Sequence, residues 1–172
     1  ILSYRMVQPV ERQEIIVEGC ARKCSPAIDP ATGNPYYFVF VDNTSHSLGT
    51  YESPYPTLTL AQNNSGVGNI IYVFPGDGTT NGMNSGITLK LNQKFWGSGV
   101  AHNLQTSSGN IIIPALSTET PTITNPDGDA VTLACVNQVS GFNIAGANNS
   151  GIMGIDVRNI SISDCTIDDS LY

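Results

Sequence analysis

Short apolar runs separated by turn-rich gaps recur along most of this chain. The strongest is Tyr36–Val41, an unbroken run of aromatic and β-branched residues that predicts a strand. Further runs follow at residues 69–74, 86–91, 109–113, 130–134 and 151–155, and their starts are about 17 to 23 residues apart. Gly, Asn, Ser and Thr fill the gaps, as expected of tight turns, because Gly and Asn tolerate left-handed backbone angles. The pattern predicts an all-β protein built from short strands.

A finer self-similarity appears towards the C-terminus. Residues 139–144 (Val-Ser-Gly-Phe-Asn-Ile) resemble residues 162–167 (Ile-Ser-Asp-Cys-Thr-Ile) with a shift of 23 positions, and Val131 and Ile152 open similar runs 21 positions apart. Repeats of this length, made of short strands without long helices, are typical of a β-solenoid. We therefore expect coils of about 21–23 residues, each with up to three short strands. About five such coils would stack in parallel at about 4.8 Å.

One short helix is expected ahead of the repeats. Pro56 suits its first turn, residues 57–62 would form it, and Asn64-Ser65-Gly66 would end it. Leu58, Leu60 and Ala61 would give it an apolar face. A helix this short is unstable alone, so we expect it to cover the exposed end of the stacked strands.

The chain divides into two parts on this pattern. Residues 1–35 read as a junction or cap segment, with strands within residues 1–18 and a loop rich in Pro and Gly after them. Residues 36–172 read as the N-terminal coils of the solenoid. Because the last coil ends without a polar capping element, we expect further coils beyond Tyr172.

Charge is scarce and mostly negative. Only 12% of the residues are charged, against about 25% in ordinary soluble domains, and the net charge is −7. Residues 95–172 carry seven acidic side chains and a single basic one, Arg158. Such a surface repels nucleic acid and is poor at attracting anionic membranes. No apolar stretch is long enough to predict a membrane-spanning helix.

Residues 49–76 resemble the entry segment of right-handed parallel β-helix proteins. The shared features are Gly49-Thr50, the Pro-aromatic-x-Thr-Leu stretch at residues 54–58, Gly68, and the Ile-x-Val-x-Pro-Gly sequence at residues 71–76. Residues 86–89 and 95–99 are similar to the second coil of such proteins. The resemblance covers about residues 36–172. It implies a single-stranded, right-handed parallel β-helix of the pectate-lyase-like type with a short N-terminal capping helix.

The N-terminal region adds a second resemblance. Residues 5–17 and 36–43 are similar to the junction that follows the outer-membrane barrel in autotransporter-like bacterial proteins whose barrel precedes the passenger. Such passengers are displayed outside the cell and commonly act in adhesion. The resemblance therefore implies an extracellular, outer-membrane-attached passenger that contacts host or environmental surface molecules. The barrel itself is missing from this chain, so display is implied rather than seen.

Many β-helix proteins cleave polysaccharides, and hydrolysis of glycosides needs paired carboxylates. The adjacent Asp168 and Asp169, with Asp164 before them, are the candidates, and Arg158 is the basic residue available to a lyase on the later coils. The Gly-His-Gly and Arg-x-Lys motifs of β-helix polygalacturonases are missing. We therefore expect no catalytic activity from this chain.

Two candidate binding sites and one candidate disulfide have two interpretations each. Asp127 and Asp129 flank Gly128 and could supply oxygen ligands for calcium, but a plain turn between coils is the better explanation and no cofactor is expected. Trp96 is suited either to stacking on a sugar or to packing. Cys20 and Cys24 are close enough in sequence for a local disulfide, with free thiols as the alternative.

Three functions remain open on the sequence. The first is a non-enzymatic, surface-displayed passenger for adhesion or surface interaction. The second is the N-terminal part of a carbohydrate-active β-helix enzyme, a lyase or hydrolase whose catalytic coils lie beyond Tyr172. The third is a glycan-binding module that uses polar bends and Trp96.

Overall fold

The computed structural model describes residues 26–46 and 48–168 of the chain. These residues form an all-β protein with one helix, as the sequence pattern predicted. The strands expected within residues 1–18, the Cys20–Cys24 disulfide and Asp169 lie outside the described residues.

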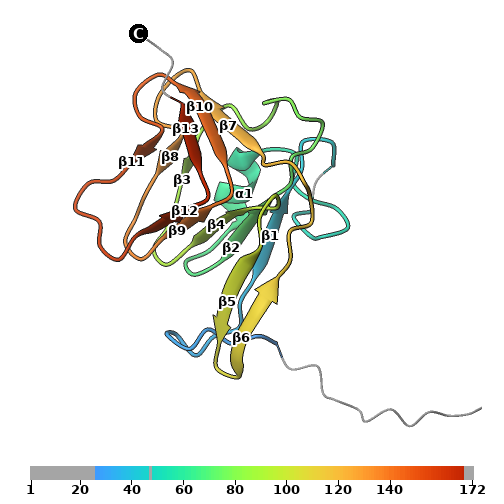
Figure 1. The fold of residues 1–172 in the computed structure, drawn as a ribbon, viewed down its shortest axis with the longest axis vertical. Helices are drawn as coiled ribbons and strands as arrows, with labels where there is room; N and C mark the ends of the chain where they lie inside the picture. The colour runs from blue at the N-terminus through green and yellow to red at the C-terminus, as the bar shows by residue number, and fades with distance from the viewer. Residues whose placement is uncertain (1–25, 47, 169–172) are drawn as a thin grey trace, which may run out of the picture.

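The largest sheet has five parallel strands (Figure 1). Its spatial order is β1 (Phe38–Val41), β2 (Ile70–Val73), β4 (Lys94–Gly97), β9 (Gln138–Ser140) and β12 (Ser161–Ser163). In the register of neighbouring strands, Val39 pairs with Ile71, Ile71 with Phe95, and Phe95 with Val139. All four side chains are buried in one core column. Because side chains alternate along a strand, the flanking positions face the other side of the sheet.

Two smaller parallel sheets complete the core. One is β7 (Thr122–Asn125), β10 (Asn143–Ala147) and β13 (Thr166–Asp168), and the other is β3 (Ile87–Thr88), β8 (Val131–Thr132) and β11 (Ile152–Met153). Val131 pairs with Ile152, and Val139 pairs with Ile162. Both repeats read from the sequence are thereby confirmed as strand partners.

The chain visits the three sheets in a fixed order. It passes through β7, β8 and β9, and then through β10, β11 and β12 in the same succession (Figure 1). Apolar side chains from all three sheets form one core, in which the rings of Phe95 and Phe142 stack with centroids 4.2 Å apart. Residues that follow one another by about one repeat are therefore neighbours in space.

Residues 109–113 correct one prediction. The sequence pattern placed them among the repeated core strands, but they form β6 (Gly109–Ile113), which pairs antiparallel with β5 (His102–Thr106). A two-residue turn at Ser107-Ser108 joins the strands, and the Thr106 hydroxyl donates to the carbonyl of Gly109 at 2.6 Å. The hairpin projects from the body of the molecule (Figure 1). It is an insertion, because β4 pairs directly with β9 on either side of it.

The predicted short helix is confirmed as α1 (Leu58–Asn64). The Thr57 side chain caps it by accepting from the backbone N–H of Leu60, so Pro56 precedes the cap and is not in the first turn. Leu58 and Ala61 are fully buried, but Leu60 is 37% exposed and does not belong to the apolar face. The helix packs against β1 and β3, each the end strand of its sheet.

Buried amides hold the corner between two of the sheets. The Gln93 side chain, 1% exposed, donates to the Ser65 hydroxyl and the Gly66 carbonyl and accepts from the N–H of Lys90. At the bend before the neighbouring strand β9, the fully buried Asn137 donates to the carbonyls of Lys90 and Gln93 at 2.8 and 3.1 Å. These bonds give backbone groups at the bends further hydrogen-bond partners and tie the two bends together.

Candidate functional site

The outer face of the five-stranded sheet carries a second apolar cluster. Its buried members are Ile70, Tyr72, Trp96 and Leu104, and partly buried side chains of residues 27, 36, 38, 40, 74 and 113 pack around them. Leu104 belongs to the β5–β6 hairpin, so the hairpin is anchored on this face. The anchored hairpin and the segment around residues 27–36 stand beside the sheet as two walls.

His102 ties the base of the hairpin to the sheet. Its ring lies parallel to that of Trp96, with centroids 4.6 Å apart, and its Nε2 is 2.7 Å from the carbonyl oxygen of Gly97. A carbonyl only accepts, so Nε2 carries the proton in this contact. Burial lowers the pKa of His102, although the Gly97 carbonyl and the charge of Asp164 oppose that effect.

Trp96, the candidate sugar platform, is packed into this cluster. Its side chain is 2% exposed and the His102 imidazole stacks on its ring. Trp96 therefore packs between the sheet and the hairpin, and although it is among the residues that line a hollow beside the hairpin, it is only 2% exposed.

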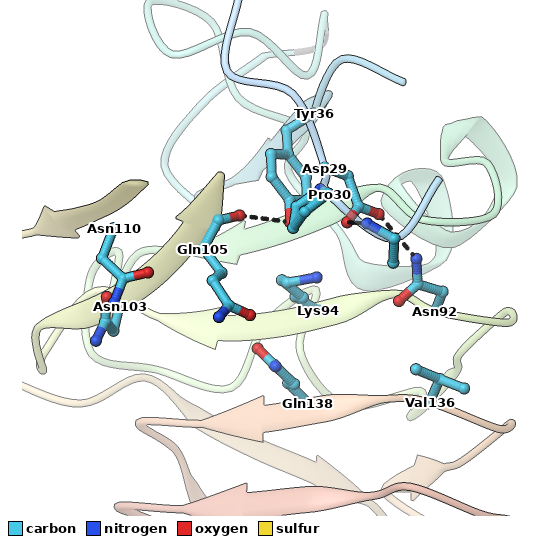
Figure 2. A pocket seen from close by; sticks show the side chains of 11 residues that line it. Asp29, Pro30, Tyr36, Asn92, Lys94, Asn103, Gln105, Asn110, Val136 and Gln138 are labelled. Atoms are coloured by element: carbon cyan, nitrogen blue, oxygen red, sulfur yellow. Dashed lines mark hydrogen bonds between the residues drawn. The ribbon is translucent and has the colours of Figure 1, made fainter. Parts of the chain in front are cut away.

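A polar cavity of about 380 Å³ lies between the two walls and the sheet (Figure 2). Five of the residues that line it carry a side-chain amide. The lining is Asp29, Pro30, Ala31, Tyr36, Asn92, Lys94, Asn103, Gln105, Asn110, Val136 and Gln138. The residues come from the 27–36 segment, from β4 and β9 with the bends before them, and from the β5–β6 hairpin.

Lys94 supplies the positive charge of this cavity. It occupies an outward position at the start of β4 and is only 7% exposed, and its Nζ lies 5.0 Å from the centre of the Tyr36 ring. Burial lowers the pKa of Lys94, and the charge of Asp29 opposes the shift. Among the interactions of residues 26–46 and 48–168, Nζ has no hydrogen bond and no ion pair, and it is not one of the fully enclosed polar atoms, so it is open to the cavity.

Asp29 balances this charge without contacting it. Its carboxylate accepts from the Ala31 N–H at 3.0 Å, the Thr32 hydroxyl at 3.1 Å and the Asn92 amide at 3.2 Å. Burial alone would raise the pKa of Asp29, but these hydrogen bonds and the charge of Lys94 outweigh it and lower the pKa.

Tyr36 forms the wall above Lys94. Its hydroxyl donates to the backbone carbonyl of Gln105 at 2.9 Å, which joins the 27–36 segment to the hairpin across the cavity (Figure 2). Burial and the charge of Asp29 raise the pKa of Tyr36 to about 12. The tyrosine therefore stays neutral and acts as a fixed hydrogen-bond donor.

A second hollow of about 330 Å³ continues the first along the sheet and shares Asn103 and Gln138 with it. Its lining includes Asp164, whose carboxylate lies 3.4 Å from the Ser140 hydroxyl. The Ser163 hydroxyl in turn donates to that of Ser140 at 3.1 Å. Together the two hollows form a polar groove across β4, β9 and β12.

The catalytic candidates are not gathered into one site. Asp164 follows β12 and lines the groove, whereas Arg158 lies before β12, at its other end. Asp168 lies in β13 of a different sheet, and Asp169 falls outside the described residues. The described candidates are thus spread over two sheets and the bends beside them.

The calcium candidates occupy a turn held by Asn125. Its side-chain oxygen accepts from the N–H of Asp127 at 3.2 Å, and its amide donates to the backbone carbonyl of Asp129 at 2.7 Å. Across the described part of the chain, no group of three or more His, Cys, Asp or Glu residues is placed to hold a metal ion. The same residues contain no helix with the length and apolar character needed to cross a membrane.

Sequence reasoning did not identify Asp29, Tyr36 or Lys94. Lys94 gave the best available signal, because it directly precedes the apolar pair Phe95-Trp96 in a strand, where a lysine is unexpected. Nothing along the chain linked it to Asp29, which is 65 positions earlier in the sequence.

No known protein family, no curated protein and no solved structure significantly matches this chain. Its function therefore has to be inferred from the geometry of the site.

Proposed function

We propose that residues 36–168 are coils of a right-handed parallel β-helix. The fixed order in which the chain visits three parallel sheets supports this, as do partner spacings of 21 and 23 residues such as Val131 with Ile152 and Val139 with Ile162. In such a stack the backbone groups of each coil pair with the coils above and below, at about 4.8 Å. The fold is then stable without a bound cofactor.

On this scaffold we propose a non-enzymatic binding function, adhesion or surface interaction, with glycans as ligands. The observation that carries the proposal is the groove of amide and hydroxyl side chains on the outer face of the largest sheet. Amides both donate and accept hydrogen bonds, so they match the hydroxyl groups of a sugar. Asn103 and Gln138, which line both halves of the groove, make no side-chain hydrogen bond to other described residues.

A binding role is favoured over catalysis by the distribution of charged groups. The first hollow is lined by one carboxylate, Asp29, which is occupied by three hydrogen bonds. The second is lined by Asp164. Glycoside hydrolysis requires two carboxyl groups about 5–9.5 Å apart across the scissile bond, and Asp29 is already engaged as a structural acceptor.

We further propose that the protein is displayed on a bacterial surface. The resemblance of residues 5–17 and 36–43 to the junction after an outer-membrane barrel supports an extracellular, membrane-attached parent protein. The net charge of −7 disfavours nucleic acid as a partner, because phosphate backbones would be repelled.

A panel of neutral and acidic oligosaccharides, immobilised and probed with the chain, tests the binding proposal. The double variant Asn103→Ala/Gln138→Ala is expected to lose most of the binding. The double variant Asn148→Ala/Asn149→Ala removes two exposed amides away from the groove and is the matched control. Retention of binding in the groove variant, or no binding to any glycan, would reject the proposal. Release of sugar products would show that the chain is an enzyme.

A further inference from the structure

We propose that the cavity around Lys94 binds a carboxylated sugar residue, with Nζ of Lys94 as the partner of the carboxylate. This inference rests on the proposed glycan-binding function and specifies its ligand. The three observations that support it are the state of Lys94, the engagement of Asp29, and the lining and size of the cavity.

The ammonium group of Lys94 has no hydrogen-bond acceptor among the described residues. Burying an ammonium group is unfavourable unless it is paired and hydrogen-bonded. Lys94 as a whole is only 7% exposed, although its Nζ is not one of the fully enclosed polar atoms, and the described residues offer its three N–H donors only the face of the Tyr36 ring, at 5.0 Å. The side chain lines the cavity between the two walls (Figure 2). A ligand that enters the cavity therefore meets an ammonium group with free donors.

Asp29 stabilises the charged form of Lys94 without pairing with it. Its negative charge favours the charged form of Lys94, yet its oxygens already accept three hydrogen bonds from the 29–32 turn and Asn92. Because no described acceptor contacts Nζ, a ligand that enters the cavity can bind it in place of solvent. A carboxylate is preferred to a hydroxyl, because hydrogen bonds between ionised groups are roughly twice as strong as neutral ones.

The rest of the lining fits the hydroxyl groups of a sugar. Side-chain amides from three strands line the cavity, at Asn103, Gln105, Asn110 and Gln138. The Tyr36 hydroxyl already donates to the backbone carbonyl of Gln105. A volume of about 380 Å³ is near the lower end of ligand pockets, so the ligand is small, about one or two sugar units. An acidic peptide fits less well, because the lining offers few apolar contacts for its backbone and β-carbons.

Chemical-shift titration of the ¹⁵N-labelled chain tests the inference, with sodium glucuronate, its uncharged methyl ester and glucose as probes. We expect glucuronate to shift the amides of Lys94 and Gln138 and to bind about tenfold more tightly than either neutral probe. In Lys94→Met that preference disappears. Asn148→Ala changes an exposed side chain away from the groove and leaves the preference intact.

Trp96 fluorescence reports whether each variant is folded, and Lys94→Gln replaces Lys94→Met if the latter is not. Equal binding of glucose and glucuronate would overturn the carboxylate assignment and leave the glycan-binding proposal standing. A glucuronate preference that survives in Lys94→Met would overturn the role of the lysine. Binding of a short Asp-rich peptide without binding of any sugar would overturn the sugar assignment and the proposed function together.

Discussion

Asn137 gives the sharpest test of how the sheets are joined. Replacing it by Ala removes two donors and one acceptor from a fully buried corner. The N–H of Ala134 loses its only described partner, which costs about 1–3 kcal/mol for a buried group. The carbonyls of Lys90 and Gln93 keep their bonds to the N–H groups of Gln93 and Gln138, so each loses only about 0.5–1 kcal/mol. We expect the free energy of unfolding to fall by about 2–5 kcal/mol.

Urea titration followed by Trp96 fluorescence measures this loss, since Trp96 is the single tryptophan and is 2% exposed. Asn148→Ala is the matched control, because Asn148 is an exposed asparagine in a turn and its removal is expected to change stability by less than about 0.5 kcal/mol. If Asn137→Ala is no less stable than Asn148→Ala, the corner amides do not join the sheets and the reasoning is wrong.

Three further changes probe the core, a close backbone contact and the hairpin. Phe95→Ala removes a buried ring stacked on Phe142 and should lower the free energy of unfolding by about 3–5 kcal/mol in urea titration; a loss below about 1 kcal/mol would contradict the packing. Gly97→Ala would place a Cβ in overlap with the Gly141 carbonyl oxygen, so we expect a lower Tm by calorimetry, and an unchanged Tm would contradict this close approach. Because burial lowers the pKa of His102 below 6.5, the unfolded chain binds more protons than the native chain between that lowered pKa and 6.5. Stability should therefore fall as pH drops through this window, and His102→Asn should remove that part of the slope in urea titrations at several pH values; an identical slope in both proteins would refute it.

The repeat in the sequence predicted the core well, because the same residues that form the pattern pair in space. The β5–β6 hairpin shows where the pattern fails. Residues 109–113 are as apolar as a core strand, yet Ile112 is 72% exposed. Only the partner strand distinguishes the two cases, and residues 102–106 with the Ser107-Ser108 turn could have indicated that partner.

The candidate site was less predictable than the fold. The cavity joins Asp29 and Tyr36 from one segment, Lys94 from a central strand, and Asn110 from the hairpin. Its character depends on burial and on which hydrogen bonds are already made, and neither is visible in residue types alone. Conversely, the acidic residues that stand out in the sequence, Asp164 and Asp168, fall on two different sheets or their bends.

The inserted hairpin also bears on how the chain can assemble. Phe95 and Val139 are partners 44 positions apart, about twice the separation of Val139 and Ile162. Closing a loop of twice the length costs about 0.6 kcal/mol more in chain entropy. The hairpin cancels this difference, because its own strands pair locally and the N–H groups of Leu116 and Ser117 return to the carbonyl of Ser98. Once the hairpin has formed, the central sheet closes over a shorter effective span, so the hairpin that lines the groove also shortens the longest connection between paired strands of this sheet among the described residues.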